Sequence, residues 1–193
     1  MTGKAKLPES NPVLLSKDRR RAVLAGCTVA VMGLVLLTTA LIRLRLLSFP
    51  LERDEGEYAY MGQLLLQGIV PYGESVSMKW PGTYLIYAAI MVVFGQTTAG
   101  IHAGLVVTSL AASLLLFLLG RRIAGTVCGS ASAAACSALS IGTPTLGLAA
   151  HATHFVVVCA LGGFVLLTGR RPTAPWRLLA SGLLFGFACV VKQ

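Results

Sequence analysis

Three long runs without a charged residue constrain this 193-residue chain more than any other feature. They cover residues 22–42, 80–120 and 123–169, and each exceeds the roughly 18 apolar positions that a helix needs to cross a bilayer. Backbone inside lipid must satisfy its own hydrogen bonds, so such runs fold as helices. Because 55% of the residues are hydrophobic and only 12% are charged, the sequence predicts an all-α polytopic membrane protein.

The charges at the ends of these runs predict the orientation of the chain. Three arginines, Arg19 to Arg21, precede the first run, so residues 1–21 are expected as a cytoplasmic polar tail and 22–42 as the first span. The net charge of +9 does not indicate nucleic-acid binding, because the basic residues are spread over run ends rather than gathered in one patch. The first span then places residues 43–97 on the extracytoplasmic face of the plasma membrane.

The preference of positive charge for the cytoplasmic side also divides the remaining runs into spans. Arg121-Arg122 and the arginines after residue 169 are expected in the cytoplasm, because 123–169 is long enough for an out-and-back pair of helices. A single span at 98–120 carries the chain from the outer face back to the cytoplasm, as this placement of Arg121-Arg122 requires. Residues 83–95 are too few to span and are expected as an interfacial helix. With a last span at about 176–191, we expect five transmembrane helices.

Five of the seven acidic residues lie between Glu52 and Glu74, inside the predicted outer loop. The segment DEGEYAYMGQLLLQG is typical of a short amphipathic helix, and Asp54 and Glu57 have the spacing of a capping box. That interpretation makes these two acids structural and leaves Glu52, Glu55 and Glu74 as solvated charge. In the functional alternative, a carboxylate here deprotonates an acceptor hydroxyl or binds a divalent cation beside a phosphate. Spacing alone does not decide between the two.

Three other polar groups each have two interpretations. Lys79-Trp80-Pro81 is either an interfacial anchor that opens the next helix or a cation that faces a lipid-linked phosphate. Arg43 and Arg45 either snorkel to headgroups, which is favoured, or attract an anionic lipid or substrate. His151 and His154 share one predicted helix face, and ordinary hydrogen bonding is favoured over a metal or substrate role.

The order of these features resembles a known family. The first span is followed by an outer Asp54-Glu55 pair, by Tyr58 on an amphipathic helix, by Lys79-Trp80-Pro81 and by a span that ends in Arg121-Arg122. This pattern over residues 22–193 is similar to the GT-C class of membrane glycosyltransferases, specifically the protein O-mannosyltransferase and lipid A aminoarabinose transferase group. The resemblance implies that 22–193 is the N-terminal part of a transmembrane glycosyltransferase domain, with its catalytic loop at about 43–97.

The activity that the resemblance implies is inverting sugar transfer on the extracytoplasmic face. The donor would be a sugar linked to a polyprenyl phosphate, and the acceptor would be a hydroxyl of a glycan, a lipid or a protein. Asp54 would be the catalytic base, Glu55 would shape the loop, and Tyr58 would pack it against the rest of the domain.

The resemblance also implies how the donor phosphate is held. Lys79 would bind it, helped by Arg53 or Lys192, and Trp80 replaces the first proline of the family's Lys-Pro-Pro element. Met78 stands where some relatives carry a metal-binding acid, which argues against a divalent cation as cofactor.

Two other classes of function stay open from the sequence. The chain fits a transporter or flippase fragment whose acidic loop gates a proton or cation path, or a non-catalytic membrane scaffold. Transport acids are expected within spans, and the predicted spans after the loop contain none. Because members of the resembled family are longer, we expect this chain to be the N-terminal part of a larger enzyme.

Overall fold

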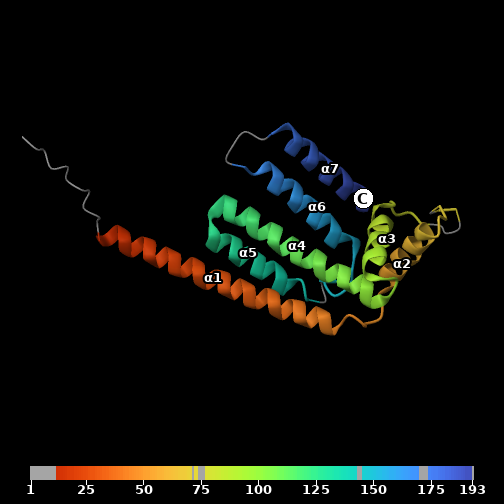
Figure 1. The fold of residues 1–193 in the computed structure, drawn as a ribbon, viewed down its shortest axis with the longest axis horizontal. Helices are drawn as coiled ribbons and strands as arrows, with labels where there is room; N and C mark the ends of the chain where they lie inside the picture. The colour runs from red at the N-terminus through yellow and green to blue at the C-terminus, as the bar shows by residue number, and fades with distance from the viewer. Residues whose placement is uncertain (1–11, 71, 74–76, 143–144, 170–173, 193) are drawn as a thin grey trace, which may run out of the picture.

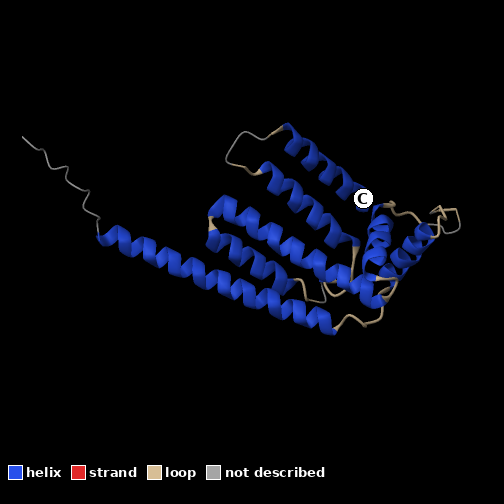
Figure 2. Ribbon diagram, viewed as in Figure 1, coloured by secondary structure: helices blue, strands red, loops and turns tan. Residues whose placement is uncertain are grey.

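The protein is all-helical wherever the structure describes it. The computed structural model describes residues 12–70, 72–73, 77–142, 145–169 and 174–192, and this part contains helices and loops but no strand (Figure 2). The prediction of an all-α chain is therefore confirmed for the described residues. The helices are α1 (Pro12–Arg45), α2 (Arg53–Leu66), α3 (Gly82–Phe94), α4 (Thr98–Ala124), α5 (Thr126–Leu139), α6 (Ala152–Leu167) and α7 (Pro175–Val191).

Five of these helices form an array, and the other two cross one end of it (Figure 1). In the array α5 packs against both α1 and α4, α4 packs against α6, and α6 packs against α7. Helices α2 and α3 pack on each other, and α3 also contacts α4 and α7. The segment predicted as an outer loop thus covers one end of the array with two short helices.

Glycine and threonine mark the sharp turns between neighbouring helices. Gly95 ends α3 and Gly125 separates α4 from α5, and both have φ near +90°, a region that favours glycine. Thr97 then caps α4, because its Oγ1 accepts the Gly100 N–H at 3.0 Å. These local signals explain why the long uncharged run 80–120 divides into a 13-residue helix and a 27-residue helix.

The main buried apolar cluster lies beneath α2 and α3 rather than along the array. It joins these two helices to the first turns of α4 and α6 and to the end of α7. Burial of this much aliphatic and aromatic area is the main force that holds the α2–α3 pair in place. Its members are Tyr58, Ala59, Met61, Leu64, Tyr84, Tyr87, Met91, Ile101, Leu105, Ala150, Ala152, Phe155 and Val191.

Among the described residues, two helices are long and apolar enough to cross a bilayer. Residues Arg19–Arg45 of α1 and Thr98–Ala124 of α4 each comprise 27 residues with a mean hydropathy of 2.2. At about 1.5 Å per residue, each exceeds the roughly 30 Å of a hydrocarbon core. Large apolar side chains such as Leu34 and Leu183 are about two-thirds exposed, at 65% and 66%, which suits contact with lipid. Both candidate spans therefore support association with a membrane.

The expected count of five spans stays a prediction. Helices α5, α6 and α7 are apolar but contain only 14, 16 and 17 residues. An average bilayer needs about 20 residues, with about 17 as the lower end of the range. The helix at 82–94 agrees closely with the short helix expected at 83–95, although nothing in the fold places it at an interface.

The region 123–169 differs from the expected hairpin in its packing. It does contain two helices, α5 and α6, joined by residues 140–151. However, α5 packs against α4 and α1, and α6 packs against α7 and α4, so the two helices do not pair closely with each other. The single-residue link at Gly125 folds α5 back onto α4, and the out-and-back crossing of the membrane by this region stays a prediction.

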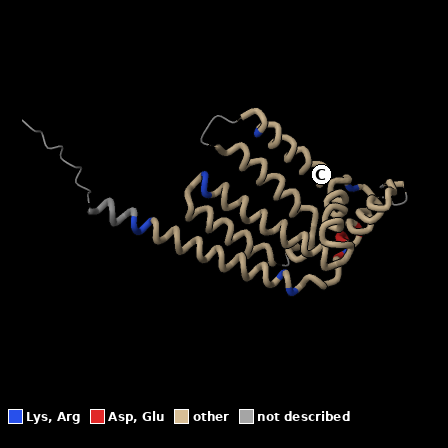
Figure 3. Tube along the Cα trace, in the orientation of Figure 1, with Lys and Arg blue, Asp and Glu red and all other residues tan. Residues whose placement is uncertain are grey.

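The acidic residues are concentrated at one end of the molecule, whereas the basic residues are not. Figure 3 marks acidic residues only at the α2–α3 end among the residues that it colours, whereas lysine and arginine are marked at both ends. The ends of α4 and α6 and the start of α7, which meet around Arg122, lie at the opposite end of the array. Arg121, Arg122 and Arg177 lie away from the acidic segment, as predicted, whereas Arg170 and Arg171 lie outside the described residues.

Arg43 has neither of the roles expected from the sequence. Its side chain is buried and donates hydrogen bonds to Gly147 O, to Ser140 O at 3.1 Å and to Ser140 Oγ at 3.0 Å. These carbonyls lie at and beyond the end of α5, where helical acceptors lack partners. Arg43 therefore ties α1 to the α5–α6 connection instead of snorkelling or attracting an external anion, whereas Arg45 is exposed.

Candidate functional site

The start of α2 is capped by a different pair of acids from the one predicted. Glu52 is the N-cap, its carboxylate accepts the Asp54 N–H at 2.9 Å, and Glu55 accepts the Glu52 N–H at 2.9 Å. The predicted box of Asp54 and Glu57 is therefore wrong, because the N-cap lies two residues earlier, at Glu52, and the helix starts at Arg53. This shift frees the carboxylates of Asp54 and Glu57 from capping and leaves them for other contacts.

The freed carboxylates both meet Lys79. The Lys79 Nζ lies 2.9 Å from Glu57 Oε2 and 3.5 Å from Asp54 Oδ2. It also lies 4.6 Å from the centroid of the Tyr58 ring, within cation–π range. One ammonium group thus joins two acids and an aromatic face, and the Lys79 side chain keeps 39% of its area exposed.

A hydroxyl network fixes Glu57 from the other side. Ser77 Oγ donates to Glu57 Oε1 at 3.0 Å, Tyr84 OH donates to the same oxygen at 3.2 Å, and the Ser77 and Tyr84 hydroxyls are 2.6 Å apart. Tyr72 OH donates to Lys79 O at 2.7 Å and so holds the backbone at the lysine. The segment before α3 is therefore tied to α2 through Glu57, which makes Glu57 the main structural partner of Lys79.

Tyr58 lies at the centre of the packing under the site. It is 3% exposed, and its ring lies 5.4 Å from that of Tyr87, 6.2 Å from that of Tyr84 and 6.3 Å from that of His151. Tilted and edge-on arrangements of this kind are the favoured ones for aromatic pairs. The position given to Tyr58 by the resemblance is thus a packing position in the fold.

Glu55 is buried, contrary to the expectation of a solvated charge. It is 1% exposed, accepts the Ala150 N–H and the Glu52 N–H, and places Oε1 3.4 Å from His102 Nε2. His102 on α4 is itself 4% exposed, and its Nδ1 lies 3.0 Å from Leu47 O. Glu55 therefore links α2 to the segment before α6 through a hydrogen bond and to the start of α4 through its 3.4 Å contact with His102.

Of the two histidines considered from the sequence, only His151 reaches the acids. It lies at the N-cap of α6, and its Nε2 is 3.4 Å from Asp54 Oδ2. His154 points elsewhere, with its Nε2 3.4 Å from Leu146 O. The expected shared face is absent because His151 precedes the first helical residue, Ala152, in an extended conformation.

A cavity of about 300 Å³ opens beside these residues. Asp54, Lys79, His151 and Lys192 give it charged and polar walls, and Trp80 flanks the lysine. Its full lining is Asp54, Tyr58, Met78, Lys79, Trp80, Thr83, His151, Ala152, Val191 and Lys192. The fold therefore brings together Asp54, Tyr58, Lys79 and Lys192, which come from three separate segments of the sequence.

Arg53 approaches the same carboxylate from solvent. Its Nη2 lies 3.5 Å from Asp54 Oδ1, and 91% of its side chain is exposed. An exposed pair of this kind contributes little stability, about 0–1 kcal/mol. Its effect is on the local charge rather than on the shape of the cavity.

The electrostatic environment keeps these acids ionised. Burial alone raises the pKa of the Asp54 carboxyl, but the charge and hydrogen bond of Lys79, with Arg53 and His151, bring that pKa below its usual value. The pKa of Glu57 is lowered in the same way against its own burial by Lys79 and Ser77. Burial alone lowers the pKa of Lys79, but Glu57 and Tyr58 raise it overall. At neutral pH the site thus holds two carboxylates and a fully charged ammonium.

Metal ligation is not favoured by this set of groups. Among the described residues no three His, Cys, Asp or Glu side chains gather in a geometry for a metal ion. Asp54 and His151 form a pair, but the third group that reaches Asp54 Oδ2 is the ammonium of Lys79, which repels a cation. The arrangement is better suited to an anion or a hydroxyl near Asp54.

No protein-family model, no curated protein and no solved structure matches this chain. The site is therefore interpreted from its own chemistry. Sequence reasoning missed His102 and Glu57 as partners of Glu55 and Lys79. The signal for Glu57 was present, because it lies one helical turn after Asp54 and so faces the same side of α2. For His102 the only signal was its position in the first turn of a predicted span.

Proposed function

We propose that this protein is a membrane glycosyltransferase that moves a sugar from a polyprenyl-phosphate-linked donor to an acceptor hydroxyl, with inversion. The observation that carries the proposal is the cavity in which the Asp54 carboxylate faces Lys79 and Lys192. A base for the hydroxyl and cations for the leaving phosphate are the two groups that such a transfer requires at one place.

Asp54 is the proposed base. Its carboxylate borders the cavity, keeps 23% of its side-chain area exposed and is not used by the helix cap. The low pKa of this carboxyl means that it is ionised before the acceptor arrives. A weak base of this kind takes the proton late, when a transition state with oxocarbenium character has already made the attacking hydroxyl acidic.

The proposed phosphate site uses the cations around that carboxylate. Lys79, Arg53 and Lys192 carry three positive charges against the two negative charges of Asp54 and Glu57. One positive charge remains, and a sugar–phosphate–lipid diester carries one negative charge. Lys79 would shift from Asp54 toward the phosphate while it keeps its shorter contact with Glu57. The glycosyl–oxygen bond breaks as the acceptor oxygen bonds to the anomeric carbon, and the polyprenyl phosphate leaves.

The proposed location is the plasma membrane, with the N-terminus in the cytoplasm and the α2–α3 end outside. The long donor chain needs lipid next to the cavity. Trp80 borders the cavity and is half exposed, and Leu85, Val92 and Val93 on α3 are exposed apolar side chains. Tryptophan at headgroup depth above an apolar helix is the arrangement found where proteins meet a bilayer surface. Five spans, as expected from the charges, remain part of this proposal.

The transporter and scaffold alternatives have less support from the structure. A proton path needs an acid whose contacts can change, and the buried Glu55 is held by two backbone N–H groups. A scaffold does not need a carboxylate beside a cavity with two lysines. We therefore keep sugar transfer as the proposed activity.

Donor binding tests the proposal directly. Native mass spectrometry of the detergent-purified chain, mixed with a polyprenyl-phosphate mannose as probe, should show a one-to-one adduct. Lys79→Gln should weaken this binding about tenfold, since it removes a charge-assisted contact worth about 1.5 kcal/mol. Arg45→Gln is the matched control, because Arg45 is exposed at the end of α1 and does not line the cavity. Equal binding by the Lys79→Gln chain would contradict the assignment.

A further inference from the structure

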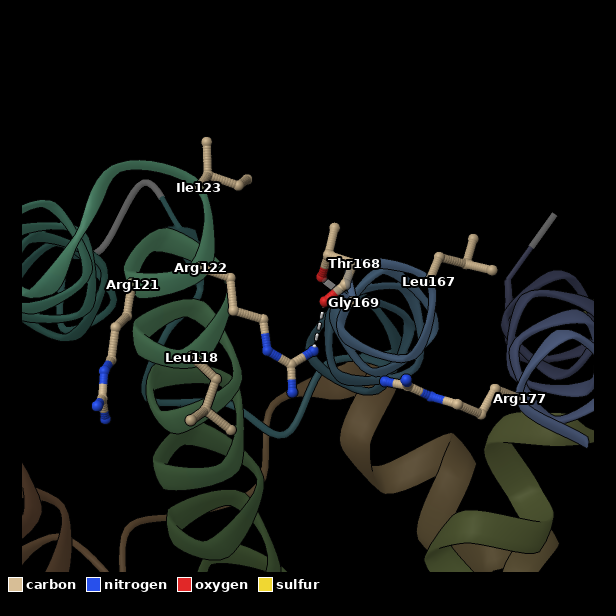
Figure 4. Close-up of a pocket in the computed structure, with 8 residues that line it drawn as sticks. All are labelled: Leu118, Arg121, Arg122, Ile123, Leu167, Thr168, Gly169 and Arg177. Atoms are coloured by element: carbon tan, nitrogen blue, oxygen red, sulfur yellow. Dashed lines mark hydrogen bonds between the residues drawn. The ribbon is translucent and has the colours of Figure 1, made fainter. Parts of the chain in front are cut away.

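A second and larger cavity lies at the opposite end of the helical array. It has a volume of about 830 Å³ and is formed where α4 and α6 end and α7 begins (Figure 4). Three arginines line it, and no carboxylate is among the eight lining residues, which are Leu118, Arg121, Arg122, Ile123, Leu167, Thr168, Gly169 and Arg177. The proposed glycosyl transfer uses none of these residues.

Two of the three arginines, Arg122 and Arg177, are arranged so that donors face the cavity, whereas Arg121 extends along the other side of α4 (Figure 4). Arg122 reaches from α4 to the end of α6, where its Nη1 donates to Val165 O and to Thr168 O at 2.9 Å. Within the described residues these bonds use only Nη1, so Nη2 and Nε of the same guanidinium stay available. Figure 4 shows Arg122 and Arg177 pointing toward each other from either side of the α6 end. Two planar guanidinium groups converging in this way match the geometry of a phosphate.

The walls of the cavity are apolar as well as basic. Leu118, Ile123 and Leu167 line it, and Ile123 and Leu167 are exposed to the surroundings. An inorganic anion has no use for such side chains, whereas a phospholipid places acyl chains beside its headgroup phosphate. Because α4 is long enough to span a bilayer, its terminal arginines fall at headgroup depth.

We propose that this cavity binds the headgroup phosphate of an anionic phospholipid, with Arg122 and Arg177 as the main donors and Arg121 adding charge at the rim. This inference rests on the placement of the chain in a membrane but not on sugar transfer, since the cavity lies at the other end of the array. The bound lipid would hold α4, α6 and α7 together at an end where the main apolar cluster is absent.

Tryptophan quenching by brominated lipid provides the test. The chain has two tryptophans, so the Trp80→Phe variant leaves Trp176, the neighbour of Arg177, as the only reporter. The full chain is reconstituted in phosphatidylcholine vesicles that contain either brominated phosphatidylglycerol or brominated phosphatidylcholine at the same mole fraction. We expect phosphatidylglycerol to quench more strongly. The preference should fall about fivefold for Arg177→Gln and by a smaller factor for Arg121→Gln, and both variants leave the Arg122 bonds to α6 intact.

The controls separate this site from general surface charge and from soluble phosphate. Arg45→Gln, at the other end of the molecule, should keep the full preference for phosphatidylglycerol. Equal quenching by the two lipids, or an equal loss in Arg45→Gln, would overturn the proposal. Reversal by millimolar inorganic phosphate, but not by chloride of the same ionic strength, would assign the cavity to a free anion and also overturn it. Absence of any quenching would contradict the membrane placement itself.

Discussion

At the residue scale, the site depends on how one lysine is shared between two acids. Lys79 makes its shorter contact with Glu57 and its longer contact with Asp54, so Glu57 holds the lysine while Asp54 stays accessible to the cavity. The sequence indicated Asp54 and Lys79 through a resemblance, but it did not indicate Glu57 as the intermediary. That role follows from the position of the α2 cap, which a pattern of several neighbouring acids leaves ambiguous.

Because Lys79 is shared between two acids, we expect the stability from this group to be lost at acid pH and at strongly alkaline pH. The pKa values of Asp54 and Glu57 are lowered by folding, so their contribution is present above about pH 4–5 and is lost as the pH falls through their folded values. The pKa of Lys79 is raised, so its contribution is present below about pH 10 and is lost only as the pH rises further. Stability from this group should therefore be constant between about pH 5 and pH 9.

Thermal unfolding in detergent measures this dependence. Lys79→Gln should lower the midpoint by about 1–3 °C at pH 7 and make the acid-side loss shallower. Part of that loss should remain, because the pKa of the buried Glu55 is also lowered by its hydrogen bonds, against the effect of its burial. Arg45→Gln should follow the parent chain at every pH. An unchanged acid-side slope in Lys79→Gln would show that the lysine does not hold these acids.

At the scale of single helices, the sequence located the elements well and their partners poorly. The short helix that starts near Asp54, the helix at 82–94 and the long helix from Thr98 were all expected near their observed positions, from an amphipathic pattern and from the lengths of the uncharged runs. The packing of α5 and α6 on α4 was not expected, since hydropathy has no term for which apolar faces meet. Close contacts between backbones decide that choice.

Substitution of Gly129 on α5 tests the close contact between α4 and α5, and Gly182 on α7 provides the control. A Cβ on Gly129 would lie 2.5 Å from Phe117 O and 2.8 Å from Arg121 N, so Gly129→Ala must push the two helices apart. The expected cost is about 1–3 kcal/mol. Gly182 has nothing within 4 Å of its Cβ position, so Gly182→Ala should be neutral or stabilise α7 by up to about 1 kcal/mol. Thermal unfolding of the two variants side by side separates these effects, and equal midpoints would contradict the observed packing.

At the scale of the whole molecule, the main organising feature is that the two ends of the helical array carry different charged residues. The acidic residues marked in Figure 3 lie with α2 and α3, and the arginine-lined cavity lies where α4 and α6 end. The sequence predicted this separation from charge parity along the chain. It did not predict the buried Arg43 or the buried Glu55, because both are charges whose partners are backbone groups distant in sequence.

Membrane placement predicts that the two ends are accessible from opposite sides. In a chain without its five native cysteines, a single cysteine is introduced at Gly73, near the α2–α3 end, or at Gly169, beside the arginine cavity. Both positions are exposed. A membrane-impermeant maleimide added to intact cells should label Gly73→Cys, and it should label Gly169→Cys only after permeabilisation. Labelling of both, or of neither, in intact cells would contradict the proposed topology.

The central claim is that Asp54 acts as a base beside a bound lipid-phosphate donor, and a comparison of binding with turnover tests it most directly. Asp54→Asn is assayed for adduct formation with the polyprenyl-phosphate mannose probe and for mannose transfer to a hydroxyl acceptor, with Asp54→Glu as the conservative control. The account predicts donor binding within about threefold of the parent chain, transfer reduced by about 10²–10⁴-fold, and partial activity in Asp54→Glu. Transfer by Asp54→Asn at the parental rate, with equal protein levels, would contradict it.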